Sequence, residues 1–284
     1  MMRTIEMGRT GVHVPVIGQG TWQMGIDSGA RKQEIEALRT GIEAGLTLID
    51  TAEMYAQGGS ERVVGEAIRD VRDRVYIVTK VWPTNGTYEG TLKSADASSS
   101  RLGTTIDLYL LHWPSASIPV AETMRAMRKL VQDGVIKAVG VSNFTVELMN
   151  QAAEALGDVP LTANQLPLHL RRRAIEREVL PHCLDRRVTV MAYSPLGQGN
   201  FPEPGTAQRE LLDEIGAKYG ATAHQVAINW VASHDGVMTI PKASKVEHVL
   251  ANARALDFTL SSEDLARLDA VFPAGDAPYE TSYH

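Results

Sequence analysis

Cysteine is almost absent from the 284-residue chain, because Cys183 is the only one. A single thiol excludes an intramolecular disulfide. The histidines include no HExxH motif, and His182 and Cys183 are adjacent rather than at the spacing of metal ligands. No GxSxG motif of a serine nucleophile is present either. We therefore expect a protein without a disulfide and without a metal site.

Long apolar runs are missing too. No stretch of about 18 apolar residues could form a membrane span, and the first residues, MMRTIEMG, lack the apolar core of a signal peptide. The formal net charge of −6 argues against nucleic acids and acidic membranes as partners. We expect a cytoplasmic monomer that acts on a small molecule.

Short apolar runs alternate with helical patterns along the whole chain. After a hairpin at 3–14, we expect strands at 14–20, 46–49, 75–81, 106–111, 135–141, 161–164, 188–192 and 236–240. Helical spacing predicts helices at 31–45, 60–70, 87–102, 120–131, 148–156, 173–186, 206–219, 222–234, 245–256 and 262–271. We expect Ser60 to be the N-cap of the second of these helices. Eight strand–helix units favour an α/β fold of the (β/α)8 TIM barrel type over an open doubly wound sheet. No linker is visible, so we expect one domain over 1–284, with an N-terminal β-hairpin and extra helices near the C-terminus.

Polar and aromatic residues follow almost every expected strand. In a (β/α)8 barrel, the carboxyl ends of the strands surround the active site. The residues at these ends are Thr21, Trp22, Asp50, Tyr55, Lys80, Trp82, His112, Trp113, Ser142, Asn143, Gln165, Tyr193, Ser194 and Lys242.

Asp50, Tyr55, Lys80 and His112 make chemical sense as one catalytic group. A tyrosine is a weak acid, and a nearby ammonium lowers its pKa. A buried Lys80 would need an anion, which Asp50 can supply. His112 can donate a hydrogen bond to a carbonyl oxygen. The set suits reduction of a carbonyl, in which a hydride reaches carbon and a proton reaches oxygen. Because side chains supply no hydride, we expect a nicotinamide cofactor.

Each of these residues alone has an ordinary structural explanation. Asp50 could cap a turn, Tyr55 could pack at an interface, and His112 could be a core histidine with its hydrogen bonds satisfied. Lys80 could be a solvated charge, or the Schiff-base lysine of a lyase or isomerase barrel. Their placement together at one end of successive strands is what favours a catalytic site.

The expected phosphate site follows the last strand. Ser244 and Glu247 have the spacing of a capping box, so we expect a helix to begin there. Helix N-termini bind phosphates, and Lys242 and Lys245 add positive charge. A GxGxxG pattern begins at Gly18 but is not completed, because position 23 is glutamine.

Aromatic residues predict the substrate pocket. Trp22, Trp82 and Trp113 would line it together with Tyr55 and His112. Trp230 has helical spacing with Val226 and Ala227, so we assign it to the core.

Ordered motifs over nearly the whole chain resemble those of the aldo-keto reductase family. They are VIGQGTW, LIDTAEMY, VTKV, LYLLHWP, GVSNF, NQ, AYSPL and IPKASK. The resemblance is greatest to small bacterial members that reduce methylglyoxal and related aldehydes or dicarbonyls. It implies a barrel that uses NADPH without a metal, with Tyr55 as proton donor, Lys80 and Asp50 tuning it, and His112 orienting the carbonyl.

The same resemblance implies the cofactor contacts. The nicotinamide would be held by Ser142, Asn143, Gln165 and Tyr193, and the pyrophosphate path would be lined by Ser194, Pro195 and Leu196. The full set of expected cofactor contacts adds Thr21, Trp22, Asp50, Ile240, Pro241, Lys242, Ser244, Lys245, His248 and Asn252. The chain departs from the family pattern at Ala243, His248 and Ala251, where many members have serine, arginine and an acidic residue.

One alternative function is a regulatory subunit that binds the cofactor without catalysis. The complete tetrad favours an enzyme instead.

We predict that NADPH is preferred to NADH, because Lys242, Ser244 and Lys245 remain to bind the 2′-phosphate, although NADH can also be used. The kcat/KM at neutral pH should be higher with NADPH than with NADH in a carbonyl-reduction assay. An equal or higher kcat/KM with NADH would contradict this preference.

Overall fold

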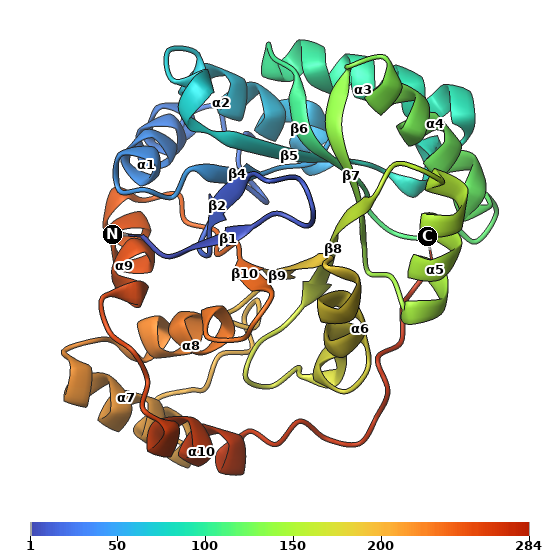
Figure 1. Ribbon diagram of the computed structural model, residues 1–284. Helices are drawn as coiled ribbons and strands as arrows, with labels where there is room; N and C mark the ends of the chain where they lie inside the picture. Colours follow the sequence, from blue (N-terminus) through green and yellow to red (C-terminus); the bar gives the residue numbers. More distant parts are fainter. Residues whose placement is uncertain (1, 284) are drawn as a thin grey trace.

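The computed structural model describes residues 2–283. The chain opens with the expected hairpin, in which β1 (Thr4–Glu6) pairs antiparallel with β2 (His13–Pro15). Gly8 and Gly11 have positive φ in the turn, which glycine adopts at little cost. The hairpin lies over the amino-terminal ends of the strands, because Gly8 N donates to Oγ1 of Thr189, the first residue of β9, at 2.8 Å. Figure 1 shows the hairpin over the middle of the ring of strands.

Eight parallel strands form the sheet, in the order of the sequence. They are β3 (Gln19–Gly20), β4 (Leu48–Asp50), β5 (Tyr76–Val81), β6 (Ile106–Leu111), β7 (Ile136–Ser142), β8 (Leu161–Pro167), β9 (Thr189–Tyr193) and β10 (Val237–Thr239). Parallel bridges from Ile17 to Thr239 and from Gly20 to Lys242 join the first strand to the last. The expected (β/α)8 barrel is therefore confirmed.

The single strand expected at 14–20 is wrong in detail. Val14 pairs with Ile5 in the hairpin, whereas Gln19 and Gly20 pair with β4 in the barrel. The chain changes partners at Val16, whose N–H donates to Arg3 O in the hairpin at 3.0 Å and whose backbone oxygen accepts from Thr239 N in the barrel at 2.8 Å.

The helices cover the outside of the barrel (Figure 1). They are α1 (Arg31–Glu43), α2 (Gly59–Ile68), α3 (Tyr88–Leu102), α4 (Val120–Gln132), α5 (Val146–Leu156), α6 (Val179–Arg186), α7 (Ala207–Tyr219), α8 (Ala223–Ala232), α9 (Val246–Ala253) and α10 (Ser262–Val271). The helix expected at 173–186 is divided into a 3₁₀ turn, Ala174–Glu176, and α6. As expected, there are extra helices near the C-terminus: α7 comes before the last strand, and α10 comes after α9. No helix within residues 2–283 is both long and apolar enough to cross a membrane.

Two predicted helix starts are wrong. Helix α2 begins at Gly59 with Gly58 as its N-cap, so Ser60 is not the cap. Helix α9 begins at Val246 with Lys245 as its N-cap, and no side chain caps it, so the capping box of Ser244 and Glu247 does not form.

The core has an inner and an outer layer. Inside the barrel, residues such as Leu48, Val78, Leu108 and Met238 pack together. A larger cluster fills the space between strands and helices, and Trp230 belongs to it, as predicted. Burying these side chains contributes on the order of 1.5–3 kcal/mol for each large one.

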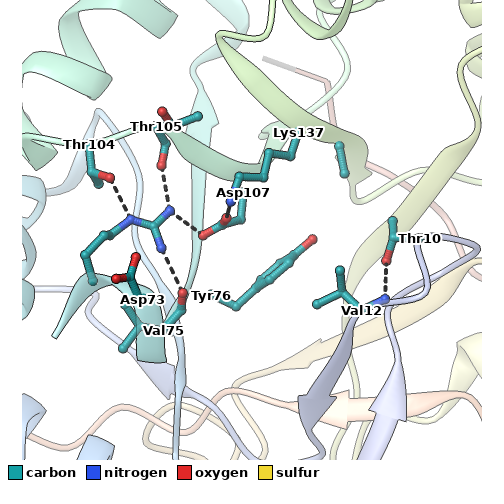
Figure 2. Close-up of a pocket in the computed structure, with 11 residues that line it drawn as sticks. Thr10, Val12, Asp73, Val75, Tyr76, Thr104, Thr105, Asp107 and Lys137 are labelled. Atoms are coloured by element: carbon teal, nitrogen blue, oxygen red, sulfur yellow. Dashed lines mark hydrogen bonds and ion pairs between the residues drawn. The ribbon is translucent and has the colours of Figure 1, made fainter.

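A polar cavity of about 550 Å³ lies at the amino-terminal end of the barrel (Figure 2). Its main charges are paired within the wall, because Asp107 accepts from Arg72 and from Lys137, each at 2.7 Å. Asp107 also accepts from Ile77 N at 2.8 Å. These contacts hold the first residues of neighbouring strands together, and we interpret the cavity as structural.

The closing seam of the barrel depends on a glycine. A Cβ atom at Gly20 would lie 2.7 Å from the backbone oxygen of Ile240. That contact is too short to exist, so β3 and the residues after β10 could not approach as they do.

We expect Gly20→Ala to lower the free energy of unfolding by about 1–3 kcal/mol, because the strands must separate to admit the methyl group. Urea unfolding followed by circular dichroism measures this. Gly29→Ala is the matched control, since a Cβ there meets only the Asp27 carboxylate, at 3.2 Å or more. Equal stability of the two variants would show that the seam tolerates a side chain.

Candidate functional site

A cavity of about 430 Å³ opens at the carboxyl ends of the strands. Two other cavities of similar size lie within residues 2–283, and neither is lined by the residues that follow the strands at this end. Its lining includes residues from loops after every strand: Gly20, Thr21, Trp22, Asp50, Met54, Tyr55, Trp82, His112, Trp113, Ser142, Asn143, Gln165, Arg172, Tyr193, Ser194, Gln198, Ile240 and Lys242. The strand-end argument therefore identified most of this wall.

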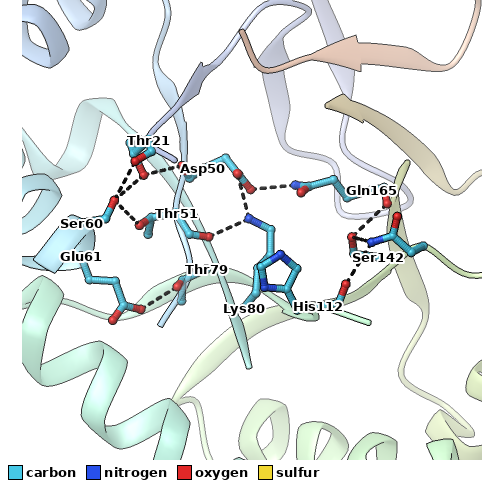
Figure 3. Close-up of polar contacts among 11 residues, drawn as sticks. Thr21, Asp50, Thr51, Ser60, Glu61, Thr79, Lys80, His112, Ser142 and Gln165 are labelled. Atoms are coloured by element: carbon cyan, nitrogen blue, oxygen red, sulfur yellow. Dashed lines mark hydrogen bonds and ion pairs between the residues drawn. The ribbon is translucent and has the colours of Figure 1, made fainter. Parts of the chain in front are cut away.

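A buried ion pair lies in the floor of the cavity (Figure 3). Lys80 Nζ donates to Asp50 Oδ2 at 2.8 Å and to the backbone oxygen of Thr51 at 2.8 Å. Gln165 Nε2 donates to the other carboxylate oxygen of Asp50 at 2.7 Å. Burial raises the pKa of Asp50 and lowers that of Lys80, and their mutual attraction opposes both shifts.

Tyr55 and His112 meet above this pair. Their ring centroids are 5.8 Å apart in an edge-on arrangement, and the ring centroids of Trp82 and His112 are 5.2 Å apart in a second edge-on arrangement. Lys80 Nζ lies 5.1 Å from the centroid of the Tyr55 ring. The four residues expected to act together are thus brought together.

The expected lowering of the Tyr55 pKa is wrong. Burial raises the pKa of Tyr55 well above its ordinary value, and the negative charge of Asp50 raises it further. Lys80 does not reverse this, because its charge is matched at 2.8 Å by Asp50. The phenol therefore keeps its proton over the physiological pH range.

Unusual backbone conformations place Tyr55. After it, Ala56 and Gln57 have φ of 48° and 52°, in the left-handed region. Such residues cost on the order of 1 kcal/mol or more and persist only where surrounding structure holds them. Ser60 supplies part of that support, because its hydroxyl donates to Thr21 Oγ1 at 2.7 Å and accepts from Thr51 Oγ1 at 3.0 Å.

A second buried charge anchors the helix that follows. Glu61 is fully buried and accepts from Thr79 Oγ1 at 2.6 Å (Figure 3). It also accepts from Arg101 Nε at 2.5 Å. These bonds tie the start of α2 to β5 and to α3. The loop that carries Tyr55 is thereby fixed at both ends.

The wall opposite Tyr55 carries the groups expected to hold a nicotinamide. Tyr193 donates its hydroxyl proton to Asn143 Oδ1 at 2.8 Å, which fixes the ring. Asn143 Nδ2 donates to Ser142 Oγ at 2.9 Å, and Ser142 Oγ donates to the Gln165 backbone oxygen at 3.0 Å. Asn143 has a φ of 65°, so its backbone too is held in a costly conformation.

Several predicted residues do not line the cavity. Lys80 lies beneath it, while the others follow β9 or β10: Pro195, Leu196, Pro241, Ser244, Lys245, His248 and Asn252. Lys242 donates to Ser244 Oγ at 3.4 Å, which connects this group to the cavity edge. Lys245 and His248 are exposed on the first turn of α9 or just before it.

Sequence reasoning missed Gly20, Met54, Arg172 and Gln198 as lining residues. Met54 is 42% exposed at the mouth. Arg172 and Gln198 stand well beyond the ends of their strands, so the strand-end argument could not reach them. Three arginines in a row at 171–173 were the available signal for Arg172.

Within residues 2–283, no group of three or more histidine, cysteine or acidic side chains could hold a metal ion. The cavity instead offers hydrogen-bonding groups, aromatic rings and the ion pair.

We expect Lys80→Met to lower the free energy of unfolding by about 3–5 kcal/mol, because it leaves the buried Asp50 charge uncompensated. Urea unfolding measures the loss. The double variant Asp50→Asn with Lys80→Met should recover part of it. Lys129→Met is the control, since its exposed pair with Asp133 should contribute nothing measurable. A Lys80→Met protein as stable as wild type would mean that Asp50 is not charged in the fold.

Comparison with known proteins agrees with this architecture and chemistry. The model of the Aldo/keto reductase family matches residues 16–272. The chain is 47% identical to methylglyoxal reductase YeaE of Escherichia coli (strain K12) over 93% of each chain. It is 34% identical to a glyoxal reductase of Bacillus subtilis, over 92% of this chain and 90% of that one.

Among solved structures, an aldo-keto reductase of Klebsiella pneumoniae in complex with NADPH superimposes with a TM-score of 0.91. It is 43% identical, and the match covers 100% of both chains. The family model and these relatives match this chain over almost its whole length. The chain therefore belongs to the Aldo/keto reductase family.

Proposed function

We propose that the protein reduces the carbonyl group of small aldehydes, ketones or dicarbonyls to an alcohol with NADPH. The observation that carries this is the placement of Tyr55 and His112 in one cavity, directly above the Asp50–Lys80 ion pair. The relatives named a methylglyoxal reductase and a glyoxal reductase support dicarbonyls of this size as substrates.

The residues in the wall fit a nicotinamide. Gln165 uses Nε2 on Asp50 and keeps Oε1 to accept from a carboxamide. The Tyr193 ring is half-buried and fixed by Asn143, so one face can stack on a flat ring. The NADPH complex of the Klebsiella relative supports the same cofactor here. When bound, the cofactor supplies the hydride.

Side chains of this protein supply the proton. We assign Tyr55 as the group that gives H⁺ to the carbonyl oxygen as negative charge develops there. His112 is assigned to donate a hydrogen bond to the same oxygen, which orients the substrate. The raised pKa of Tyr55 keeps the proton in place until that charge appears. Lys80 then provides the nearby positive charge that stabilises the phenolate left behind.

The edge of the cavity near β10 suits the cofactor's phosphates. Lys242 lines the cavity, and Lys245 and Ser244 follow directly before α9. Free backbone N–H groups at the start of a helix add to this positive site. We assign the 2′-phosphate to Lys242, Ser244, Lys245 and His248, with Asn252 beside the adenine.

The Schiff-base alternative has a specific difficulty. Lys80 is fully buried and donates to both Asp50 and Thr51, so its nitrogen has no free approach for a carbonyl. The regulatory-subunit alternative has no observation in its favour, because the whole tetrad is in place.

We also propose that the protein is a cytoplasmic monomer of one domain. The large exposed apolar side chains of residues 2–283 are spread over different elements, and two of them, Trp22 and Met54, line the cavity. The spread of these side chains over separate elements of residues 2–283 supports a monomer. Size-exclusion chromatography with light scattering tests the monomer.

We expect Tyr55→Phe to lower kcat for methylglyoxal about 10²-fold or more, because the proton donor is lost. The Kd for NADPH, measured by protein fluorescence, should stay within about twofold of wild type. Tyr88→Phe, on the outside at the start of α3, is the matched control and should keep full activity. A Tyr55→Phe enzyme that keeps most of its turnover would refute the proton-donor assignment. A wild type that binds NADPH but reduces none of a panel of carbonyls would favour a non-catalytic role.

A further inference from the structure

Three consecutive arginines follow β8, and the structure uses them differently. Arg171, Arg172 and Arg173 lie in a turn that two backbone bonds close: His169 N donates to Arg172 O at 3.3 Å, and Arg172 N donates to His169 O at 2.8 Å. The backbone of the turn therefore has a defined shape.

Arg173 is a structural residue. It is buried and donates to both oxygens of Glu176 at 2.8 Å, to Asp269 at 2.7 Å and to the backbone oxygen of Phe272 at 2.7 Å. Its guanidinium also lies 4.8 Å from the centre of the Trp230 ring. These contacts fix the end of the turn to α8 and to the end of α10.

Arg171 fixes the other side of the turn. It donates to the backbone oxygen and to Oδ1 of Asn200 at 3.2 and 3.1 Å, and also to Gln208. The loop after β8 is thus joined to the loop after β9. Two anchored neighbours hold the backbone of Arg172 between them.

Arg172 has no such partner. Its side chain makes no hydrogen bond or ion pair with any of residues 2–283, and it lines the cavity that contains Tyr55 and His112. Arg172 is exposed at the edge of the cavity, where its charge opposes the rise that burial causes in the pKa of Tyr193, to about 12.

The charges of the cavity are unbalanced. Asp50 is the only acidic residue in its lining, and Lys80 neutralises it from below. Arg172 and Lys242 then leave a positive mouth on a chain whose formal net charge is −6. A local positive mouth on a negative protein concentrates small anions at this one place.

The two cations stand on opposite sides of one loop. In the sheet, β9 lies between β8 and β10, so the loop after β9 separates Arg172 from Lys242. Lys242 has Ser244 and the start of α9 beside it for phosphates. Arg172 lies instead in the loop after β8, the strand whose Gln165 donates to Asp50.

We propose that Arg172 binds a carboxylate carried by the substrate, so that the enzyme prefers aldehydes and ketones that also bear an acid group. This rests on the proposed carbonyl reduction and names the substrate class for that site. A guanidinium binds a carboxylate through two parallel N–H···O bonds, which fixes the substrate's orientation as well as its charge. A neutral dicarbonyl reacts at the same centre without this contact.

The test uses 4-carboxybenzaldehyde and its methyl ester, in which the charge is removed, a methyl group is added and the aldehyde carbon is more electrophilic. Each variant is therefore compared with wild type on the same substrate. We expect wild type to have the higher kcat/KM for the acid, and Arg172→Ala to lower that value about tenfold, mainly through KM. The ester should change by less than about twofold. Arg172→Lys keeps the charge but loses the two-bond geometry, so it should lie between. Higher salt should reduce the preference for the acid.

Arg69→Ala is the matched control. It removes the same charge from an exposed position at the end of α2, outside the cavity, and should leave both substrates unchanged. The Kd for NADPH is measured on every variant and should stay within about twofold.

Two outcomes would overturn the proposal. Equal losses on the acid and the ester, with weaker NADPH binding, would assign Arg172 to the cofactor's pyrophosphate. Unchanged kinetics on both substrates would leave Arg172 with no ligand.

A wild type that binds NADPH but reduces neither aldehyde contradicts the proposed function instead. The same comparison is then made on the Kd of the acid and the ester, measured by calorimetry in the presence of NADP. A preference for the acid that disappears in Arg172→Ala would support the proposal, and its absence would overturn it.

Discussion

The ion pair between Lys80 and Asp50 is the constraint on which the rest of the site depends. Two opposite charges in full burial cannot be separated without a large cost, so the ends of β4 and β5 are held in one register. Gln165, from the far side of the barrel, completes the coordination of Asp50. The wall that faces the cofactor and the wall that carries Tyr55 are therefore connected through a single carboxylate.

Burial is the main reason that the Tyr55 phenol stays protonated, and the ion pair adds to it, because the negative charge of Asp50 also raises the Tyr55 pKa. A lysine with no counter-ion would attract a phenolate, whereas Lys80 is already matched. In the proposed reaction, the positive charge of Lys80 becomes important only when a second negative charge develops on Tyr55. Such a site is arranged for the charges of the transition state more than for those of the resting protein.

Much of this was predictable from the sequence. Strand–helix alternation predicted the barrel, and the polar residues after each strand predicted most of the cavity wall, because parallel strands place their carboxyl ends at one rim. What failed depended on neighbours remote in sequence. Ser60 resembles a helix cap, yet its hydroxyl bonds to Thr21. The Tyr55 pKa is raised first by burial and then by the negative charge of Asp50, and spacing reveals neither. Arg172 was missed as a lining residue because it lies well beyond the end of β8, and only the contacts that Arg171 and Arg173 make distinguish it from them.

The seam of the barrel has a consequence for synthesis on the ribosome. Ile17 and Gly20 meet Thr239 and Lys242, which lie near opposite ends of the chain. At about 5–20 residues per second, the open edge of β3 waits on the order of 10 seconds or more for its partner to be translated. Until then, the nascent sheet carries an unpaired parallel edge of the kind that recruits other strands. The brevity of β3, two residues, limits that exposure and makes the short first strand a safeguard during translation.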